Sequence, residues 1–275
     1  MTELPELLSI LKPILEADRP MTVRQCFYRL VSIGKLENCR PDYQRVSRLL
    51  TSARHDGAIL WSWITDRSRP VYRPSTWANP ADWLGEPEDY RRDPWQEQRN
   101  YVEVWCEKDA IVGSIAGVVN DDYRVYLRPM RGFATTTDVY KIAREILAVG
   151  KPAFVYYVGD HDPSGRCMDD DLVRRFTRMG CMPTFERLAI HKADIRKFKL
   201  PPMKVKEDDS RKKAFRRKFG ESCVELDALP VAELRNRIRE AIAAKIDDAA
   251  WRRNLETEKA QRAELVAFVA KFRRD

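Results

Sequence analysis

Apolar residues recur at helical spacing through the first part of the chain. Leucines and isoleucines three or four positions apart predict a helix over residues 3–17. Thr22 and Gln25 form a capping-box pattern that begins a second helix, and Gly34 is suited to end it. A third helix is predicted over residues 42–55, with apolar residues along one face.

The polar face of this third helix carries Arg45 and Arg48. A solvated helix face is the simplest interpretation of the two arginines. The apolar stretch 58–64 is predicted to be a strand, and three helices followed by a strand are typical of a winged-helix domain, here residues 1–75. In that arrangement the third helix enters the major groove of DNA, so Arg45 and Arg48 become candidate DNA-contacting residues.

A proline-rich stretch and then a regular alternation of strands and helices follow. Between residues 66 and 100 there are five prolines and three tryptophans, which predicts a linker over 76–100 that packs against a domain surface. From residue 101 to 275 the pattern predicts an α/β domain with a mainly parallel sheet, helices on both faces and C-terminal helices. The expected strands are 102–107, 123–128, 153–159 and 184–190, and the expected helices are 108–119, 137–149, 165–179, 231–245 and 248–272.

Acidic residues stand at the ends of two predicted strands. Asp160 and Asp162 follow the strand at 153–159, and Glu107 follows the strand at 102–107. Sites in open α/β sheets form at the carboxyl ends of strands, so the three carboxylates are expected to converge. Their mutual repulsion favours a bound cation, and oxygen-only ligands favour Mg²⁺. Such acids also cap helices, but one cap needs only one carboxylate, and Ser164 is expected to fill it.

Composition narrows the class of protein. The formal net charge of +8 and the pI near 9.2 favour a polyanionic partner. The six cysteines show no CxxC pair, which argues against a zinc site and favours reduced thiols in a cytoplasmic protein. No apolar run has the length of a membrane span, so no membrane partner is expected.

The segment 191–220 is strongly basic, with twelve lysines and arginines against four acids. A surface loop followed by a helix at 208–219 is predicted there. A charge run is usually only a solvated face, but if the acidic site acts on phosphates, a contact with the DNA backbone is at least as plausible. The candidate DNA-binding residues of this segment are Lys212, Lys213, Arg216 and Arg217.

Four segments, in order, resemble one protein family. The stretches 107–110 and 159–165 are similar to the Toprim signature of the DNA topoisomerase VI A subunit and its meiotic break-forming relatives. Residues 224–229 resemble another stretch of that family, and 24–28 resemble the segment with its DNA-cleaving tyrosine. The matches span roughly residues 20 to 245, and the length is closest to the compact phage and plasmid form called Mini-A.

The resemblance implies a winged-helix domain followed by a Toprim domain, and a specific chemistry. Tyr28 would be the nucleophile, assisted by Arg24, and Glu107, Asp160 and Asp162 would hold Mg²⁺. The product would be a phosphotyrosyl link to a DNA 5′ end, with one break in each strand made by a homodimer on double-stranded DNA. The tyrosine of one subunit would work with the metal of the other. A nucleoid-associated location in the cytoplasm follows.

Two departures from the family pattern and two alternatives remain. Phe27 stands where relatives often have a second tyrosine, and the loop 131–135 matches only loosely. No GxxxxGK[ST] phosphate loop occurs, so ATP-driven strand passage would need a separate ATPase subunit.

A hydrolytic Toprim nuclease, in which water attacks and Tyr28 is structural, is one alternative. A non-catalytic winged-helix DNA-binding protein is the other.

Overall fold

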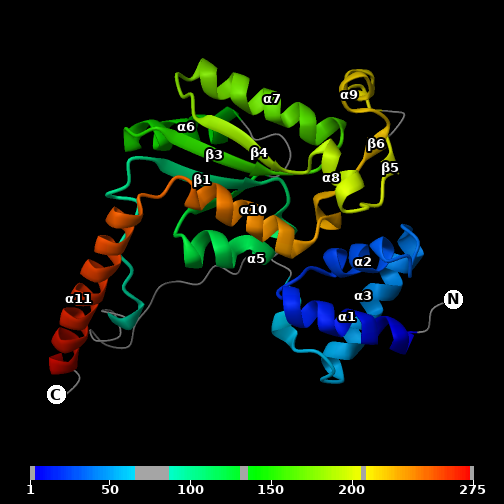
Figure 1. Ribbon diagram of the computed structural model, residues 1–275, viewed down its shortest axis with the longest axis horizontal. Helices are drawn as coiled ribbons and strands as arrows, with labels where there is room; N and C mark the ends of the chain where they lie inside the picture. Colours follow the sequence, from blue (N-terminus) through cyan, green and yellow to red (C-terminus); the bar gives the residue numbers. More distant parts are fainter. Residues whose placement is uncertain (1–3, 66–86, 131–135, 206–208, 273–275) are drawn as a thin grey trace.

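Three N-terminal helices and a sheet flanked by helices form the two main parts of the molecule (Figure 1). The structure is a computed structural model. It describes residues 4–65, 87–130, 136–205 and 209–272.

The three helices predicted at the N-terminus are present. They are α1 (Leu4–Asp18), α2 (Val23–Ser32) and α3 (Arg40–His55). The capping box at the start of α2 is confirmed, because the Thr22 hydroxyl accepts from the Gln25 amide at 3.1 Å and the Gln25 side chain accepts from the Thr22 amide at 2.7 Å. Buried leucines of α1 pack with the apolar faces of α2 and α3 and form one core with the adjoining face of the sheet domain.

The strand predicted at 58–64 is wrong. Residues Trp61–Trp63 form a short 3-10 helix, η1, and a single bridge joins Met21 to Ile64. An apolar run becomes a strand only when a partner strand pairs along it, and here the pairing stops after one bridge. The turn still buries the Trp63 ring, which is 7% exposed. The winged-helix assignment therefore stays a prediction.

The parallel sheet predicted for the second part is confirmed. Its four strands lie in the order β2-β1-β3-β4, and every pair is parallel. The second strand begins later than predicted because Tyr123, after the π-helical turn η3 (Gly117–Asp122), and Arg124, with a φ of 53°, are not extended. The strands are β1 (Tyr101–Cys106), β2 (Tyr126–Pro129), β3 (Ala153–Val158) and β4 (Thr184–Ala189).

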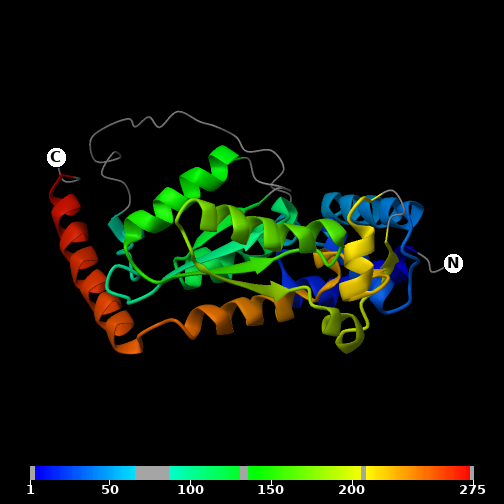
Figure 2. The same ribbon diagram turned by 90° about the horizontal axis from the view of Figure 1, so that it is seen from above.

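Helices cover both faces of the sheet, as the alternating pattern predicted (Figures 1 and 2). Successive residues of β1 point to opposite faces, so Val104 belongs to one apolar core and Trp105 to the other. On the face of Trp105 lie α6 (Thr136–Val149) and α7 (Pro163–Arg178), and on the other lie α5 (Asp109–Ala116) and α10 (Val231–Ala243).

The C-terminal helix α11 (Asp248–Phe272) packs against part of the predicted linker. Trp95 is 7% exposed, its ring centre lies 5.9 Å from that of Trp251, and its indole NH donates to the Tyr123 carbonyl at 2.7 Å. This part of the predicted linker therefore packs, and it includes the 3-10 turn η2 (Pro87–Asp89). Trp77 and Trp83 lie outside the described residues.

The basic segment after β4 is more regular than predicted. Its elements are α8 (Lys192–Lys197), β5 (Met203–Lys204) and α9 (Lys212–Phe219), followed by β6 (Ser222–Cys223) and the 3-10 turn η4 (Leu226–Ala228). Strands β5 and β6 pair antiparallel on either side of α9. Within the described ranges, none of the helices is long and apolar enough to cross a membrane.

Candidate functional site

Three carboxylates lie at the carboxyl ends of the neighbouring strands β1 and β3. Glu107 follows β1, and its amide donates to the Val158 carbonyl at 3.0 Å. Asp160 and Asp162 follow β3, and the Asp160 amide donates to Glu107 Oε2 at 2.8 Å. Residues separated by more than fifty positions thus share one edge of the sheet, which is where parallel α/β folds place their sites.

Two glycines let the Glu107 side chain occupy this position. A Cβ on Gly159 would lie 2.5 Å from Glu107 Oε2, and a Cβ on Gly165 would lie 3.1 Å from the same oxygen and 2.6 Å from the Asp160 carbonyl oxygen. A larger residue at either position would displace the carboxylate or the loop. Both glycines are therefore needed for the approach of Glu107 to the loop.

Negative charge is concentrated around Glu107. Burial raises the pKa of Glu107 to about 7, and the nearby carboxylates of Asp160 and Asp162 act in the same direction. Burial also raises the pKa of Asp160. Burial and like charge therefore favour binding of a proton or a cation by these carboxylates.

Each of these carboxylates already uses one oxygen within the protein. Asp160 Oδ1 accepts from the Leu226 amide at 2.7 Å, and Asp162 Oδ1 accepts from the Gly165 amide at 2.7 Å. Asp162 is therefore the N-cap of α7, and the expectation that Ser164 fills this role is wrong. The Asp162 carboxylate reaches the free amides of the first turn from the position just before the helix, whereas Ser164 lies inside that turn.

The donor chemistry fits a hard cation, but the side chains are not arranged around one. In the described part of the chain, no three His, Cys, Asp or Glu residues are grouped as a ready metal site. Among the same residues, the second oxygens of Glu107, Asp160 and Asp162 make no hydrogen bond. These oxygens are the kind of ligand that Mg²⁺ prefers. The three carboxylates could hold the ion after side-chain rotation.

Lys108 links the acidic strand end to a second acidic pair. Its ammonium lies 3.0 Å from Asp160 Oδ1, 3.0 Å from Glu225 Oε2 and 2.8 Å from Asp227 Oδ2. The Asp227 side chain is fully buried, so its charge depends on such a partner. Burial lowers the pKa of Lys108, but the three carboxylates outweigh it and raise the pKa.

Tyr28 and Arg24, the predicted nucleophile and its partner, join the same network from α2. Arg24 forms an ion pair with Glu225, and its Nε lies 3.8 Å from Asp227 Oδ2. Its guanidinium carbon lies 5.9 Å from the centre of the Tyr28 ring. The structure therefore places Tyr28 beside a network of charges that runs from Arg24 through Glu225, Asp227 and Lys108 to Asp160 within a single chain.

The phenol of Tyr28 is protonated at rest. The residue is 3% exposed, and burial raises its pKa, with Glu225 acting in the same direction. Arg24 and Lys108 oppose this shift because their positive charges stabilise the phenolate. Activation of Tyr28 would thus require the neighbouring acid to be neutralised or moved, or further positive charge to arrive.

Hydrogen bonds fix α2 against the sheet domain. Gln25 Oε1 accepts from the Ser114 hydroxyl at 2.8 Å, and Arg235 Nε donates to the Ser114 carbonyl at 2.7 Å. Arg235 also reaches the Arg19 and Pro20 carbonyls at 3.3 and 3.5 Å. These contacts hold Tyr28 beside the charges of its own chain.

Arg187 on β4 was not predicted as a site residue, yet it shapes the loop of Asp160. The residue is 8% exposed and donates to the carbonyls of Gly159 at 2.7 Å and Gly165 at 2.9 Å. It also pairs with Asp169 at 2.7 Å. The only signal in the sequence was an arginine inside an otherwise apolar strand end, which requires a buried partner.

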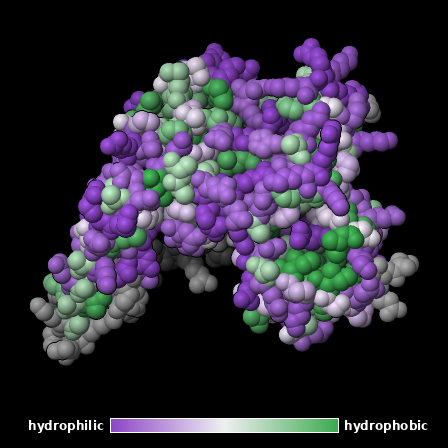
Figure 3. All heavy atoms as spheres, in the orientation of Figure 1, coloured by the Kyte–Doolittle hydropathy of each residue, from purple (hydrophilic) through white to green (hydrophobic). Residues whose placement is uncertain are grey.

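The candidate DNA-binding residues lie in two groups. Arg48 of α3 is exposed, and Arg45 lies 4.0 Å from Asp42. On α9, Lys213 and Arg217 are exposed and Lys212 and Arg216 are half-buried. Both helices lie at the end of the molecule toward which the sheet strands point (Figures 1 and 2). On the face of the molecule drawn in Figure 3, most of the surface is hydrophilic, and apolar side chains gather over the N-terminal helices.

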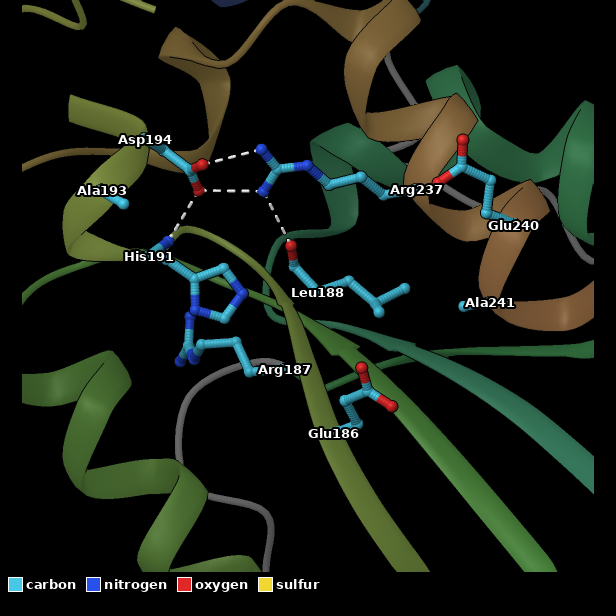
Figure 4. Close-up of a pocket in the computed structure, with 9 residues that line it drawn as sticks. All are labelled: Glu186, Arg187, Leu188, His191, Ala193, Asp194, Arg237, Glu240 and Ala241. Carbon is cyan, nitrogen blue, oxygen red and sulfur yellow. Dashed lines mark hydrogen bonds and ion pairs between the residues drawn. The ribbon is translucent and has the colours of Figure 1, made fainter. Parts of the chain in front are cut away.

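A separate cavity of about 540 Å³ lies beside β4, between α8 and α10 (Figure 4). Its principal charges are already paired, since Arg237 contacts both oxygens of Asp194 at 2.7 and 2.9 Å and donates to the Leu188 carbonyl at 2.9 Å. Burial lowers the pKa of His191 at its rim. These contacts explain how α10 is held to the sheet and do not indicate a reaction.

A scan against models of known protein families finds no match for this chain, and neither does a search of the curated proteins.

Proposed function

We propose that this protein cleaves double-stranded DNA in a Mg²⁺-dependent reaction through a phosphotyrosyl intermediate on Tyr28, as the A subunit of topoisomerase VI does. One observation carries the proposal. Tyr28 and Arg24 share a charge network with Glu225 and Asp227, and Lys108 joins that network to Asp160. The resemblance in sequence implied these roles, and the proximity of the groups supports them.

The proposed step is a transesterification. The Tyr28 oxygen forms a bond to a backbone phosphorus, and the bond from that phosphorus to the 3′ oxygen breaks. The phenol loses its proton and the released 3′ oxygen gains one. Because the phosphodiester energy is kept in the new ester, the reverse step reseals the strand. Arg24 is placed to stabilise the negative charge that develops on the phenol or the phosphate.

Glu107, Asp160 and Asp162 would hold Mg²⁺ through the oxygens that make no internal hydrogen bond. The ion would neutralise phosphate charge at the reacting group. Glu107 contributes by binding the Asp160 amide, which keeps the loop in place, and Lys108 balances the acids that face Tyr28. These positions follow from the fold, since β1 and β3 are neighbours in the sheet.

A homodimer is part of the proposal, because two strands require two tyrosines. The resemblance implies that Tyr28 of one subunit acts with the metal of the other. In a single chain Tyr28 already lies beside Lys108 and Glu225. When the homodimer forms on DNA, Tyr28 would then exchange these contacts for contacts with the other subunit, or add such contacts to them. Strand passage would also need a separate ATPase subunit.

One observation favours the hydrolytic alternative. A pKa near 7 would suit Glu107 as a general base that activates water at neutral pH. In that reaction the phosphorus would bind the water oxygen and Tyr28 would remain structural. The two chemistries differ in their product, because only transesterification leaves protein attached to DNA.

Supercoiled plasmid tests the proposal. The protein is incubated with plasmid and Mg²⁺, denatured, and divided into samples with and without protease. We expect linear DNA that is retained with protein until protease is added, and no cleavage by Asp160→Ala. Free linear DNA without protease would support the nuclease, and intact plasmid under all conditions would overturn both.

A further inference from the structure

Helix α9 has two different faces. Five of its eight residues are lysine or arginine, and the remaining large residues are Phe215 and Phe219. Phe215 is 4% exposed, whereas Lys213, Arg217 and Lys218 are exposed. The helix therefore buries its aromatic side against the protein and presents a row of positive charge outward.

The aromatic side of α9 packs on His161, the residue between Asp160 and Asp162. His161 is 0% exposed, and its ring centre lies 5.3 Å from that of Phe215 and 5.4 Å from that of Phe219, both edge-on. The Phe215 and Phe219 rings lie 5.3 Å apart. Edge-to-face rings at these distances attract each other beyond simple burial. His161 is thus inserted against both phenylalanines of the helix.

Backbone contacts continue this attachment. The His161 amide donates to the Val224 carbonyl at 2.8 Å, and the Val224 amide donates back to the His161 carbonyl at 3.0 Å. Val224 directly follows β6, the strand after α9. Neither nitrogen of the His161 ring has a well-formed hydrogen bond among the described residues, so the ring acts here by packing.

Some of the basic residues at α9 form ion pairs with neighbouring acids. Arg216 pairs with Glu221 at 2.8 Å, and Arg211 just before the helix pairs with Asp209 at 3.0 Å. The Arg166 guanidinium, in the first turn of α7 after Asp162, lies 4.5 Å from the centre of the Phe219 ring, which places α9 beside the start of α7. The helix that carries the exposed row is attached through its aromatic side to the loop of Asp160 and Asp162.

We propose that α9 is an arm that contacts the phosphate backbone of duplex DNA, and that His161 is the positioning residue that fixes this arm to the Asp160–Asp162 loop. The proposal rests on the proposed function for the identity of the polyanion. A histidine between the two aspartates thereby aligns the bound DNA with the reacting groups. His161 itself contacts neither DNA nor metal.

Binding can be measured without cleavage. Tyr28→Phe protein with EDTA is titrated with a short fluorescent duplex at several salt concentrations. Each phosphate contact contributes about 0.9 to the slope of log affinity against log salt, so adding Lys213→Ala and Arg217→Ala is expected to lower the slope by about two. The matched control, Arg253→Ala with Lys259→Ala on exposed positions of α11, should leave it unchanged.

His161 is tested in the same assay. His161→Ala removes no residue of the basic row, yet affinity should fall about tenfold if the docked arm becomes a minor state. His161→Phe keeps a ring between Phe215 and Phe219 and should restore wild-type affinity. An unchanged slope for the α9 pair, or His161→Ala binding as tightly as wild type, would overturn the inference.

The outcomes for the arm and for the proposed function are separable. If the wild type cleaves plasmid and the α9 variants bind DNA normally, the proposed function is supported and the role of α9 as a DNA-binding arm is contradicted. If DNA binding depends on salt through α9 and no cleavage occurs, the role of α9 is supported and the proposed function is contradicted. Loss of affinity for heparin with unchanged affinity for duplex would show that α9 binds another polyanion and would overturn the inference.

Discussion

Lys108→Met should destabilise the folded protein strongly. In the wild type, one ammonium lies within 3.0 Å of carboxylate oxygens of Asp160, Glu225 and Asp227. Methionine has nearly the same length and keeps the packing of the stem, but it removes the charge. The three carboxylates then remain together, and Arg24 still pairs with Glu225 and Asp227.

The size of the effect follows from burial. The Lys108 side chain is 21% exposed and that of Asp227 is 0% exposed, so the pair is largely shielded from water. Removing one partner of a buried ion pair typically costs 3–5 kcal/mol, and because Arg24 persists we expect about 3 kcal/mol. For a chain of this size such a loss lowers Tm by roughly 6–12 °C.

Thermal unfolding at two pH values tests this reasoning. Burial raises the pKa of Asp160 and Lys108 opposes that rise, so without Lys108 the folded pKa of Asp160 moves further above its unfolded value. Stability is then lost as pH rises and regained as pH falls. The Tm difference between variant and wild type should be large at pH 8 and smaller at pH 5. Equal Tm values for Lys108→Met and wild type at pH 8 would refute this reasoning. The same loss of Tm in the control Lys259→Met, at an exposed position of α11, would also refute it.

Three further changes give distinct readouts. Because the folded pKa of Glu107 is raised from 4.5 to about 7, wild-type stability without metal should fall as pH rises through that window, and denaturant unfolding of Glu107→Gln should lack this fall. Gly165→Ala places a Cβ 2.6 Å from the Asp160 carbonyl and should cost about 1–3 kcal/mol in the same assay, whereas Gly117→Ala, with its nearest atom at 3.9 Å, should cost little. Arg187→Met removes the side-chain donor to the carbonyls of Gly159, Ala189 and Gly165, the first two of which keep a backbone donor, and it also removes the 2.7 Å ion pair with Asp169. It should lower Tm by more than 5 °C, roughly a 2–3 kcal/mol loss, with no change expected in far-UV circular dichroism.

Strong periodicity made most of the fold predictable. The stripes of α1 and α3 and the alternation of apolar strands with amphipathic helices specify elements through local spacing alone. The stretch 58–64 was misjudged because an apolar run has no period that separates a strand from a buried turn. Ser164 was misjudged because Asp162 offers a cap one position before the helix begins.

The candidate site was predictable only in its strand-end acids. Glu107, Asp160 and Asp162 could be found because parallel strands end at one edge of a sheet. Lys108 and Arg187 could not, since their partners lie in other segments of the chain and depend on how the segments pack. Sequence spacing carries no information about such contacts unless the topology is already known.

Tyr28→Phe tests the central claim most directly. The change removes one hydroxyl and keeps the ring against Phe27, so the fold should survive. Plasmid is incubated with Mg²⁺ and each protein, denatured, and analysed for protein attached to DNA 5′ ends, with Tyr43→Phe on the neighbouring helix as the control. The account predicts 5′ adducts for wild type and Tyr43→Phe, and neither cleavage nor adduct for Tyr28→Phe. Normal cleavage by Tyr28→Phe would contradict it.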